Sequence, residues 1–223
     1  MKIGVYVGSF NPPHLGHMKV IEYLLENHYV DKIEVIPTGN YWNKTNLIDT
    51  IHRINMLKVY ENKEVVVNDE LNTLPYTYQV LDSLKKKYPS DELMLIIGDD
   101  NLSKFHLWKN YQEILENKVI VLRRNDINIK ETISYQYNPN SFIMVNDFPK
   151  VDISSTDIRT YLQEGKLNEA LPYLGLYALT YIVNHNLYDV FNKENDNNFQ
   201  ILDSKEKDSI KKYIKIKWNV KTY

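Results

Sequence analysis

Short runs of β-branched and aliphatic residues alternate with longer amphipathic stretches along most of this chain, and this alternation constrains the fold most. Short apolar runs between turn signals are typical of buried strands, whereas longer stretches with a 3.6-residue period are typical of helices. Strands are expected near residues 3–7, 32–36, 64–67, 93–97, 119–122 and 141–145. Helices are expected near residues 15–27, 50–60, 76–88, 108–116, 155–164 and 172–186. The pattern predicts a doubly wound, mostly parallel α/β sheet with a C-terminal helical portion.

Length and composition favour one compact domain followed by a polar segment. The chain has 223 residues, of which 43% are hydrophobic, and this is enough apolar material for a substantial core. Residues 192–198 are rich in Asn, Asp, Lys and Glu, and residues 205–223 carry many Lys. We expect a domain over residues 1–190 and an appendage over residues 191–223, whose role the sequence does not indicate.

Charge and cysteine content exclude several classes of function. The formal net charge of −2 gives no electrostatic footprint for nucleic acid. The absence of cysteine excludes disulfides, thiolate zinc sites and cysteine nucleophiles. The first residues lack the apolar segment of a signal peptide, and no apolar run approaches the ~20 residues of a membrane span. A cytoplasmic protein without a membrane partner is expected, and assembly into a homo-oligomer is left open.

The first motif, GSFNPPHLGH, covers residues 8–17 and lies where the first strand ends and the first helix begins. Ligands of open α/β sheets bind at the carboxyl ends of strands, and helix N-termini favour anions. The motif is neither a Walker A loop nor a dinucleotide fingerprint, because it has neither Gly-Lys-Ser/Thr nor the glycine spacing. His14 and His17, three residues apart, are expected on one helix face, where imidazoles donate hydrogen bonds to a transferring phosphate.

The second motif, ISSTDIR, covers residues 153–159 and opens a later helix. Ser154 and Asp157 have the spacing of a capping box. The cap does not explain Arg159, since a cation near a helix N-terminus opposes the helix dipole unless an anion binds there. Hydroxyl groups, free amides and a guanidinium fork together predict a second polyphosphate site.

Together these motifs resemble the nicotinate/nicotinamide mononucleotide adenylyltransferase family of the HxGH nucleotidyltransferases. Further matches are PYTYQVL at residues 75–81, IIGDDNLSKFHLW at 96–108, VLRR at 121–124 and LPYLGLYALTYIVNHNLY at 171–188. The resemblance covers about residues 1–190 and implies a Rossmann-like nucleotidyltransferase fold. It implies that the mononucleotide 5′-phosphate attacks the α-phosphorus of ATP and releases pyrophosphate, without a general base. ATP and a pyridine mononucleotide are the implied partners, and Mg²⁺ arrives with ATP.

The resemblance also implies which residues bind each substrate. It assigns the chemical step to His14, His17 and Arg159. It assigns ATP binding to Gly8, Ser9, Phe10, His17, Gly98, Asp100, Ser155, Thr156, Asp157, Ile158 and Arg159. It assigns mononucleotide binding to Lys44, Thr77, Leu107, Trp108 and Arg124. Lys44 meets the mononucleotide phosphate in this assignment, and Trp108 stacks on the pyridine.

The chain departs from the family at two positions of the acceptor site. Many bacterial relatives carry His-Lys where this chain has Asn43-Lys44, and this weakens the assignment of Lys44. Leu74 replaces a Trp of the vertebrate enzymes, so a stacking partner is either absent or supplied by Tyr76 or Trp42. The choice between nicotinate and nicotinamide mononucleotide stays open at this point.

Other features carry weaker functional hypotheses. Asp99 and Asp100 are adjacent and do not easily share a face, so no metal site on protein ligands is predicted. His52 and Arg53 are interpreted as positional or solvent-facing, and His106 as a neighbour of the pyridine pocket. Two other functions remain: nucleotidyl transfer to another acceptor, such as a phosphopantetheine-like one, and a non-catalytic nucleotide-binding module.

Overall fold

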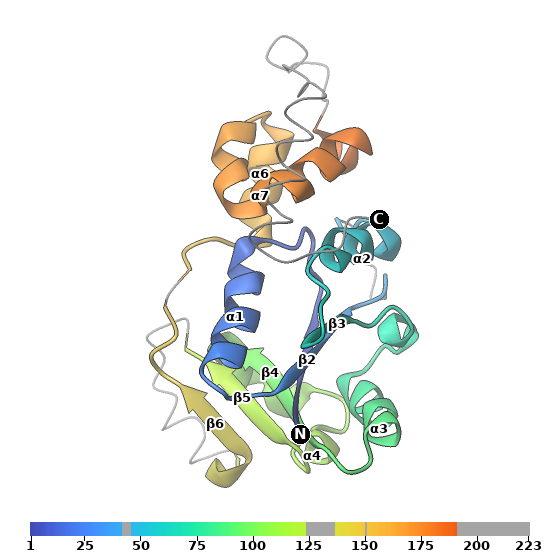
Figure 1. Ribbon diagram of the computed structural model, residues 1–223, viewed down its shortest axis with the longest axis vertical. Helices are drawn as coiled ribbons and strands as arrows, with labels where there is room; N and C mark the ends of the chain where they lie inside the picture. The colour runs from blue at the N-terminus through green and yellow to red at the C-terminus, as the bar shows by residue number, and fades with distance from the viewer. Residues whose placement is uncertain (42–45, 124–136, 150, 191–223) are drawn as a thin grey trace.

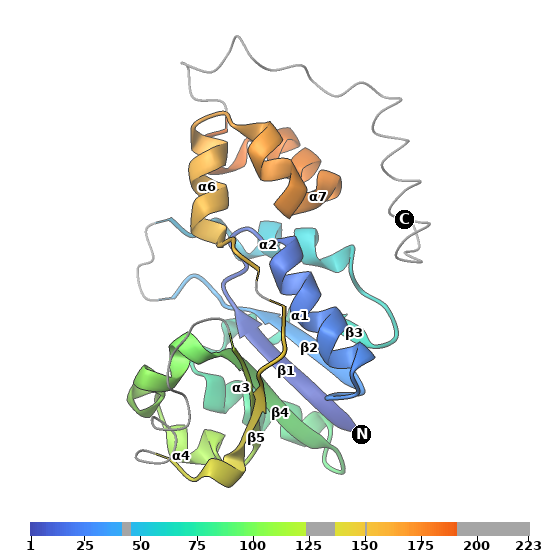
Figure 2. The same cartoon turned by 90° about the vertical axis from the view of Figure 1, so that its left-hand side faces the viewer.

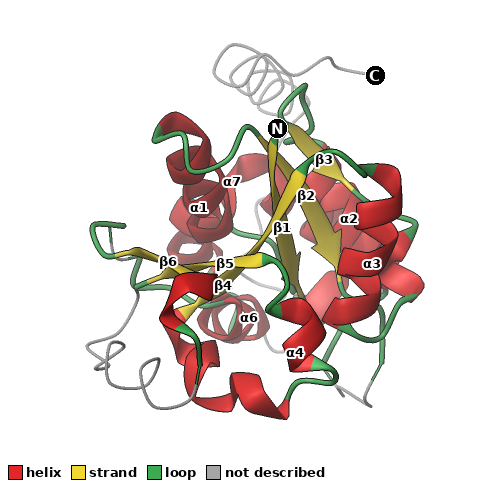
Figure 3. Cartoon of the chain, turned by 90° about the horizontal axis from the view of Figure 1, so that it is seen from below, coloured by secondary structure: helices red, strands yellow, loops and turns green. Residues whose placement is uncertain are grey.

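A single parallel sheet of six strands, in the order β3-β2-β1-β4-β5-β6, organises the protein. The computed structural model describes residues 1–41, 46–123, 137–149 and 151–190. The strands are β1 (Lys2–Gly8), β2 (Lys32–Pro37), β3 (Val65–Val67), β4 (Glu92–Gly98), β5 (Lys118–Leu122) and β6 (Phe142–Val145). Every pairing is parallel, and helices lie on both faces of the sheet (Figure 3). The predicted doubly wound α/β fold is confirmed.

Helices follow most strands, as the sequence predicts. The α-helices are α1 (Leu15–Glu26), α2 (Thr50–Lys58), α3 (Thr77–Lys87), α4 (Tyr111–Ile114), α6 (Ser155–Gln163) and α7 (Leu167–Asn184). The 3-10 helices are η1 (Leu71–Thr73), η2 (Asp99–Leu107), η3 (Pro139–Ser141) and η4 (Leu187–Asp189). No described helix has the length and apolarity that a membrane crossing requires.

The two faces of the sheet bury separate hydrophobic clusters. Met94 and Ile96 of β4 point into the cluster beneath α1 and α2, whereas Leu93, Leu95 and Ile97 point into the cluster beneath α3 and α4. This division follows from the two-residue period of a strand, whose successive side chains point to opposite faces. Both faces are apolar, and this explains why the central strands read as continuous hydrophobic runs.

Helices α6 and α7 form an additional layer beyond the carboxyl ends of the strands (Figures 1 and 2). A third cluster of buried residues holds this layer together, and Met56 of α2 joins it from the sheet domain. Helix α7 also contacts α1 and α2. The C-terminal helical portion therefore covers the edge of the sheet where ligands of such folds bind.

The chain order reverses between β1 and β4, which are neighbours in the sheet although two strands separate them in sequence. Strands leave this point in both directions, so their loops diverge and open a crevice at the carboxyl edge. Gly8 ends β1 and Gly98 ends β4, at opposite sides of that crevice. The first motif begins at Gly8.

Two helices differ from the sequence prediction. The helix expected over residues 108–116 is the single turn α4, because Trp108 is extended and Asn110 has a left-handed backbone with φ 51°. The stretch before it forms the 3-10 helix η2. The helix expected at residue 172 begins at Leu167, and Gly175 kinks it with φ 69°. The appendage predicted over residues 191–223 lies outside the described residues.

Candidate active site

The two histidines of the first motif cap α1 and each other. His14 is the N-cap residue of α1 and has an extended backbone, with φ −147° and ψ 167°. The Gly16 amide donates to Nδ1 of His14 at 3.1 Å, and the His14 amide donates to Nδ1 of His17 at 3.2 Å. The ring centroids are 3.8 Å apart. The imidazoles are neighbours, as predicted, although His14 precedes the helix and does not lie on its face.

These bonds select one tautomer for both rings. Each Nδ1 accepts a backbone hydrogen, so a neutral imidazole here carries its proton on Nε2. Two Nε2–H donors therefore lie side by side at the N-terminus of α1, where the helix dipole already favours negative charge. This is an arrangement that stabilises charge on an oxyanion.

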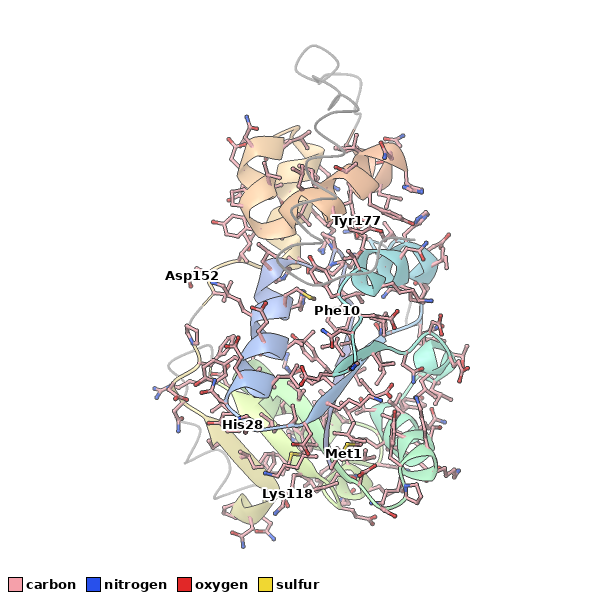
Figure 4. All side chains as sticks on the ribbon, viewed as in Figure 1. Met1, Phe10, His28, Lys118, Asp152 and Tyr177 are labelled. Atoms are coloured by element: carbon pink, nitrogen blue, oxygen red, sulfur yellow. The ribbon has the colours of Figure 1, made fainter. Side chains whose placement is uncertain are left out.

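Close packing around the histidines accounts for the glycine and the aromatic residue of the motif. A Cβ atom at Gly16 would lie 2.8 Å from the His14 ring, so only glycine leaves room for that ring. Phe10 is buried, and its ring packs edge-on against His17 with centroids 4.9 Å apart. Figure 4 shows Phe10 between the sheet and the α6–α7 layer. Phe10 thus supports the imidazoles from behind.

The second motif begins α6 with the predicted capping box. The Ser154 hydroxyl accepts from the Asp157 amide, and the Asp157 carboxylate accepts from the Ser154 amide at 2.9 Å. Hydrogen bonds from the Ser154 hydroxyl and amide lower the pKa of Asp157, and the nearby His14 lowers it further. The Ser155 hydroxyl donates to the carbonyl of Pro12 at 2.9 Å, so the two motifs touch directly.

Arg159 completes the junction between the motifs. Its Nη1 donates to the Asn11 carbonyl at 2.7 Å, and its Nη2 donates to the Thr156 hydroxyl at 3.1 Å. A cavity of about 300 Å³ opens beside it. Its lining residues are Ser9, Asn11, Asn46, Leu47, Ser155, Thr156 and Arg159. The two predicted phosphate motifs, which meet between residues 143 positions apart in sequence, therefore contribute to one cavity.

Ile158 is not among the residues that line the cavity, and its assignment to ATP stays a prediction. Its side chain is fully buried among the α6–α7 residues, and its amide donates to the Ser154 carbonyl at 3.2 Å. Neither group faces the cavity. The isoleucine of the motif anchors α6 to its own core, which fixes the direction of the neighbouring Arg159.

The other predicted residues that the structure describes, His14 and His17 among them, are not lining residues of this cavity. Gly98 ends β4, and the two aspartates after it diverge, since Asp99 is buried and Asp100 is exposed. Thr77 begins α3. Trp108 is half-buried, with its ring 5.1 Å from that of Phe105.

Three further residues are predicted to bind the mononucleotide. One of them is exposed, and two lie outside the described residues. Leu107 is 70% exposed, which is unusual for a large apolar side chain and leaves it accessible to a ligand. Lys44 and Arg124, together with Trp42 and Asn43, lie outside the described residues. The assignments to the mononucleotide stay predictions.

Arg53 is a buried scaffold residue, so the solvent-facing alternative for it is wrong. Its side chain is fully buried, and burial lowers its pKa. Its donors reach the carbonyls of Ile48, Ser9 and Thr38 and the side chains of Asn40 and Thr50, at 2.6–3.1 Å. One guanidinium thus joins the first motif to the loop between β2 and α2.

Sequence reasoning assigned no role to Asn11, Asn46 or Leu47, and it left Arg53 undecided. One signal was available: Arg53 is one of four arginines in a chain where Lys+Arg is 27. Arginine presents a rigid fork of donors that lysine does not reproduce, so a rare arginine marks a geometric requirement. The lining role of Asn46 and Leu47 depends on tertiary contacts and has no local signal.

Three further histidines make packing contacts away from the cavity. The Tyr181 hydroxyl lies 3.1 Å from Nδ1 of His52, and the His185 ring stacks on Tyr181 with centroids 4.0 Å apart. His106 is exposed, and its backbone amide donates to the Tyr137 hydroxyl at 2.8 Å. These contacts join α2 to α7 and η2 to the segment before β6.

Comparison with known families gives a match over most of the chain. Residues 5–161 match the cytidylyltransferase-like family model. A Flavobacterium johnsoniae protein named "Probable nicotinate-nucleotide adenylyltransferase" is 36% identical over 195 residues, which are 84% of this chain and 99% of that protein. A Fusobacterium nucleatum protein with the same name is 40% identical over 168 residues, 71% of this chain and 86% of its own.

Solved structures give the same result. Plasmodium falciparum nicotinic acid mononucleotide adenylyltransferase complexed with NaAD superposes with a TM-score of 0.73 at 25% identity. The match covers 86% of this chain and 98% of the parasite chain. The same parasite enzyme complexed with APC gives a TM-score of 0.71. The family model, over residues 5–161, includes both motifs.

Proposed function

This chain belongs to the nicotinate-nucleotide adenylyltransferases of the cytidylyltransferase-like family, and we propose that it transfers the adenylyl group of ATP to nicotinate mononucleotide. The observation that carries the proposal is the meeting of the two motifs at one cavity. The first motif supplies Ser9 and Asn11 to the cavity wall and caps α1 with the histidine pair, and Thr156 and Arg159 supply the wall from the start of α6. The relatives' names favour the nicotinate acceptor over the nicotinamide one.

The reaction needs position and charge stabilisation more than acid–base chemistry. A 5′-phosphate oxygen of the mononucleotide attacks the α-phosphorus of ATP. The bond from that phosphorus to the bridging oxygen breaks, and pyrophosphate leaves with the electron pair. A phosphate monoester with a second pKa of about 6 is already ionised at pH 7, so no general base is required. Catalysis then depends on orientation and on donors aimed at the developing charge.

We assign these donors from the hydrogen bonds in the site. The Nε2–H groups of His14 and His17 reach the phosphate oxygens where charge develops. Arg159 binds the β- and γ-phosphates with its fork. The Thr156 hydroxyl accepts from Arg159 and so keeps its own hydrogen for a phosphate oxygen, whereas the Ser155 hydroxyl already donates to Pro12. Ser155 therefore acts as a support between the motifs.

Mg²⁺ enters this proposal with ATP. In the parts of the chain that the structure describes, no three His, Asp or Glu side chains group closely enough to hold a metal ion. Mg²⁺ keeps several waters and commonly binds through substrate phosphates with few protein ligands, so this donor set fits a metal carried by ATP. When bound, the ion neutralises part of the polyphosphate charge.

Pyrophosphate release from ATP·Mg²⁺ tests the proposal, with nicotinate mononucleotide and nicotinamide mononucleotide in parallel reactions. We expect release with the nicotinate acceptor at the higher kcat/KM, together with the matching dinucleotide by mass spectrometry. Preference for the nicotinamide acceptor would correct the substrate and keep the reaction. A folded protein that binds ATP but turns over neither acceptor would contradict the proposal and favour another acceptor or a binding module.

A further inference from the structure

We propose that Tyr188, near the C-terminal end of the described chain, is a positioning residue for ATP. It acts by holding Asn11, and through Asn11 the Arg159 guanidinium, in the geometry that binds the ATP phosphates. The inference rests on the proposed function of the cavity. It adds a residue 177 positions away from the first motif to the machinery of that motif.

Asn11 is the point where four segments of the chain meet. Its side-chain amide donates to the Asn46 carbonyl at 2.6 Å, and its Oδ1 accepts from the Tyr188 hydroxyl at 2.8 Å. The Ile48 amide approaches the same Oδ1 at 3.4 Å. Its backbone carbonyl accepts from Arg159 at 2.7 Å. Asn11 is 5% exposed, yet it lines the cavity, so its orientation decides where that wall and Arg159 stand.

Tyr188 reaches Asn11 through an unusual backbone path. Asn186, Tyr188 and Asp189 all have left-handed backbones, with φ of 47°, 60° and 53°. Such conformations are unfavourable for residues with side chains and persist where surrounding contacts enforce them. Here Leu187, Tyr188 and Val190 are buried in the α6–α7 cluster. The turn therefore delivers one hydroxyl to one acceptor beneath the first motif.

The Tyr188 hydroxyl is a reliable donor in this position. The ring is 8% exposed, and burial raises the pKa of its hydroxyl, while Arg53 and Arg159 partly oppose that effect. It therefore stays protonated across the physiological range. The Tyr188→Phe variant keeps the ring and its packing and removes only the hydroxyl, which isolates the bond to Asn11.

Tyr181 supplies a matched control. Its hydroxyl also joins the C-terminal layer to the sheet domain, by accepting from the Asn55 amide at 3.1 Å and lying 3.1 Å from Nδ1 of His52. Both partners lie on α2, outside the two phosphate motifs. The Tyr181→Phe variant therefore loses a comparable tie between the same layers without moving Asn11.

The experiment measures the Kd of ATP·Mg²⁺ by isothermal titration calorimetry, without acceptor, on the full chain. One hydrogen bond changes an equilibrium constant about fivefold, so Tyr188→Phe is expected to raise Kd by about that factor. Tyr181→Phe should change Kd less than about twofold, with a similar fall of the unfolding temperature in both variants. Arg159→Lys should itself weaken ATP binding, and in that background Tyr188→Phe should add less than about twofold, because coupled residues are non-additive.

Each other result overturns a defined part of the account. Equal losses of affinity in the two tyrosine variants, or full additivity with Arg159→Lys, would show that Tyr188 is merely structural. A Tyr188→Phe protein whose Kd stays within twofold of the parent would do the same. A parent chain that does not bind ATP would instead overturn the proposed function, and this inference with it.

Discussion

Two fully buried charged groups, Glu34 on β2 and Arg53 on α2, lie in opposite electrostatic surroundings. Glu34 accepts from the hydroxyl of Tyr88, from Asn68 at 3.1 Å and from Nζ of Lys87 at 3.1 Å. Arg53 donates to carbonyl, amide and hydroxyl oxygens, and none of the described salt bridges includes it.

The difference separates a structural charge from a functional one. A buried ion with its own counter-ion contributes little electric field beyond its immediate contacts. Removal of either member of the pair leaves the other charge buried without compensation and destabilises the fold. Arg53 lies behind Ser9, which lines the cavity, and its hydrogen-bond acceptors are all neutral, although the Asp49 carboxylate also acts on its charge. It therefore adds positive potential to a site proposed to bind ATP, a polyanion.

The largest expected effect separates the site from the rest of the fold most clearly. His17→Ala removes a donor to the transition state, and kcat should fall about a hundredfold or more while the KM for ATP changes little. Steady-state kinetics measure both constants. His28→Asn is the control, because His28 is exposed at the other end of the molecule and asparagine tolerates its φ of 56° (Figure 4). A loss below about fivefold would remove His17 from the transition state.

A second effect tests the charge of Arg53 against its hydrogen bonds. Both Arg53→Met and Arg53→Lys break the guanidinium contacts and should lower the free energy of unfolding by about 2–3 kcal/mol. Only the methionine variant removes the charge, so its Kd for ATP should rise about tenfold, against about threefold for lysine. Denaturant melts and calorimetry give the two quantities. Equal affinities for the two variants would mean that Arg53 acts through structure alone.

A third effect concerns the stability of the Glu34 cluster at low pH. Burial by itself would raise the pKa of Glu34, but hydrogen bonds from Tyr88, Asn68 and Lys87 outweigh it and place the pKa below the ordinary 4.5. The unfolded chain then binds the proton more readily, so this stabilisation is present above about pH 4.5 and is lost as the pH falls through the folded pKa.

Glu34→Gln tests this expectation. The free energy of unfolding of the variant should be about 1–3 kcal/mol lower than that of the parent at pH 7, and it should change less as the pH falls into the acid range. The Kd for ATP should stay unchanged. Urea unfolding at several pH values measures the first two quantities. A parallel shift of the whole pH profile, or weaker ATP binding, would break the distinction drawn between Glu34 and Arg53.

The smallest expected effect concerns the proposed domain boundary. A chain ending at Val190 retains Tyr188 and every described element, so its kcat and its KM for ATP should stay within about twofold of the full chain, the range expected for changes away from the site. Steady-state kinetics of pyrophosphate release measure both constants. A large loss of activity would assign a role to residues 191–223 in the site.

The fold and the two motifs were predictable because their signals are local. The strand runs, the cap at Ser154 and the motif that carries His14 and His17 each occupy about ten residues or fewer. Hydrophobic periodicity, capping chemistry or the motif itself is therefore enough to predict them. Asn110 shows where this fails: its left-handed backbone immediately precedes α4, so the helix that periodicity starts at residue 108 begins only at Tyr111. The contact between Tyr188 and Asn11 spans 177 residues, and no local pattern encodes it. The buried state of Arg53 likewise depends on contacts with two loops, the first motif and the segment between β2 and α2.

Transfer of labelled phosphorus tests the central claim most directly. The chain is incubated with nicotinate mononucleotide and ATP that carries ³²P at the α or at the γ position, and the products are separated. Attack at the α-phosphorus predicts that all transferred α label appears in the dinucleotide and all γ label in pyrophosphate, with both signals falling together in His17→Ala. Label from the γ position in the organic product, or dinucleotide formation undiminished in His17→Ala, would contradict adenylyl transfer at this site.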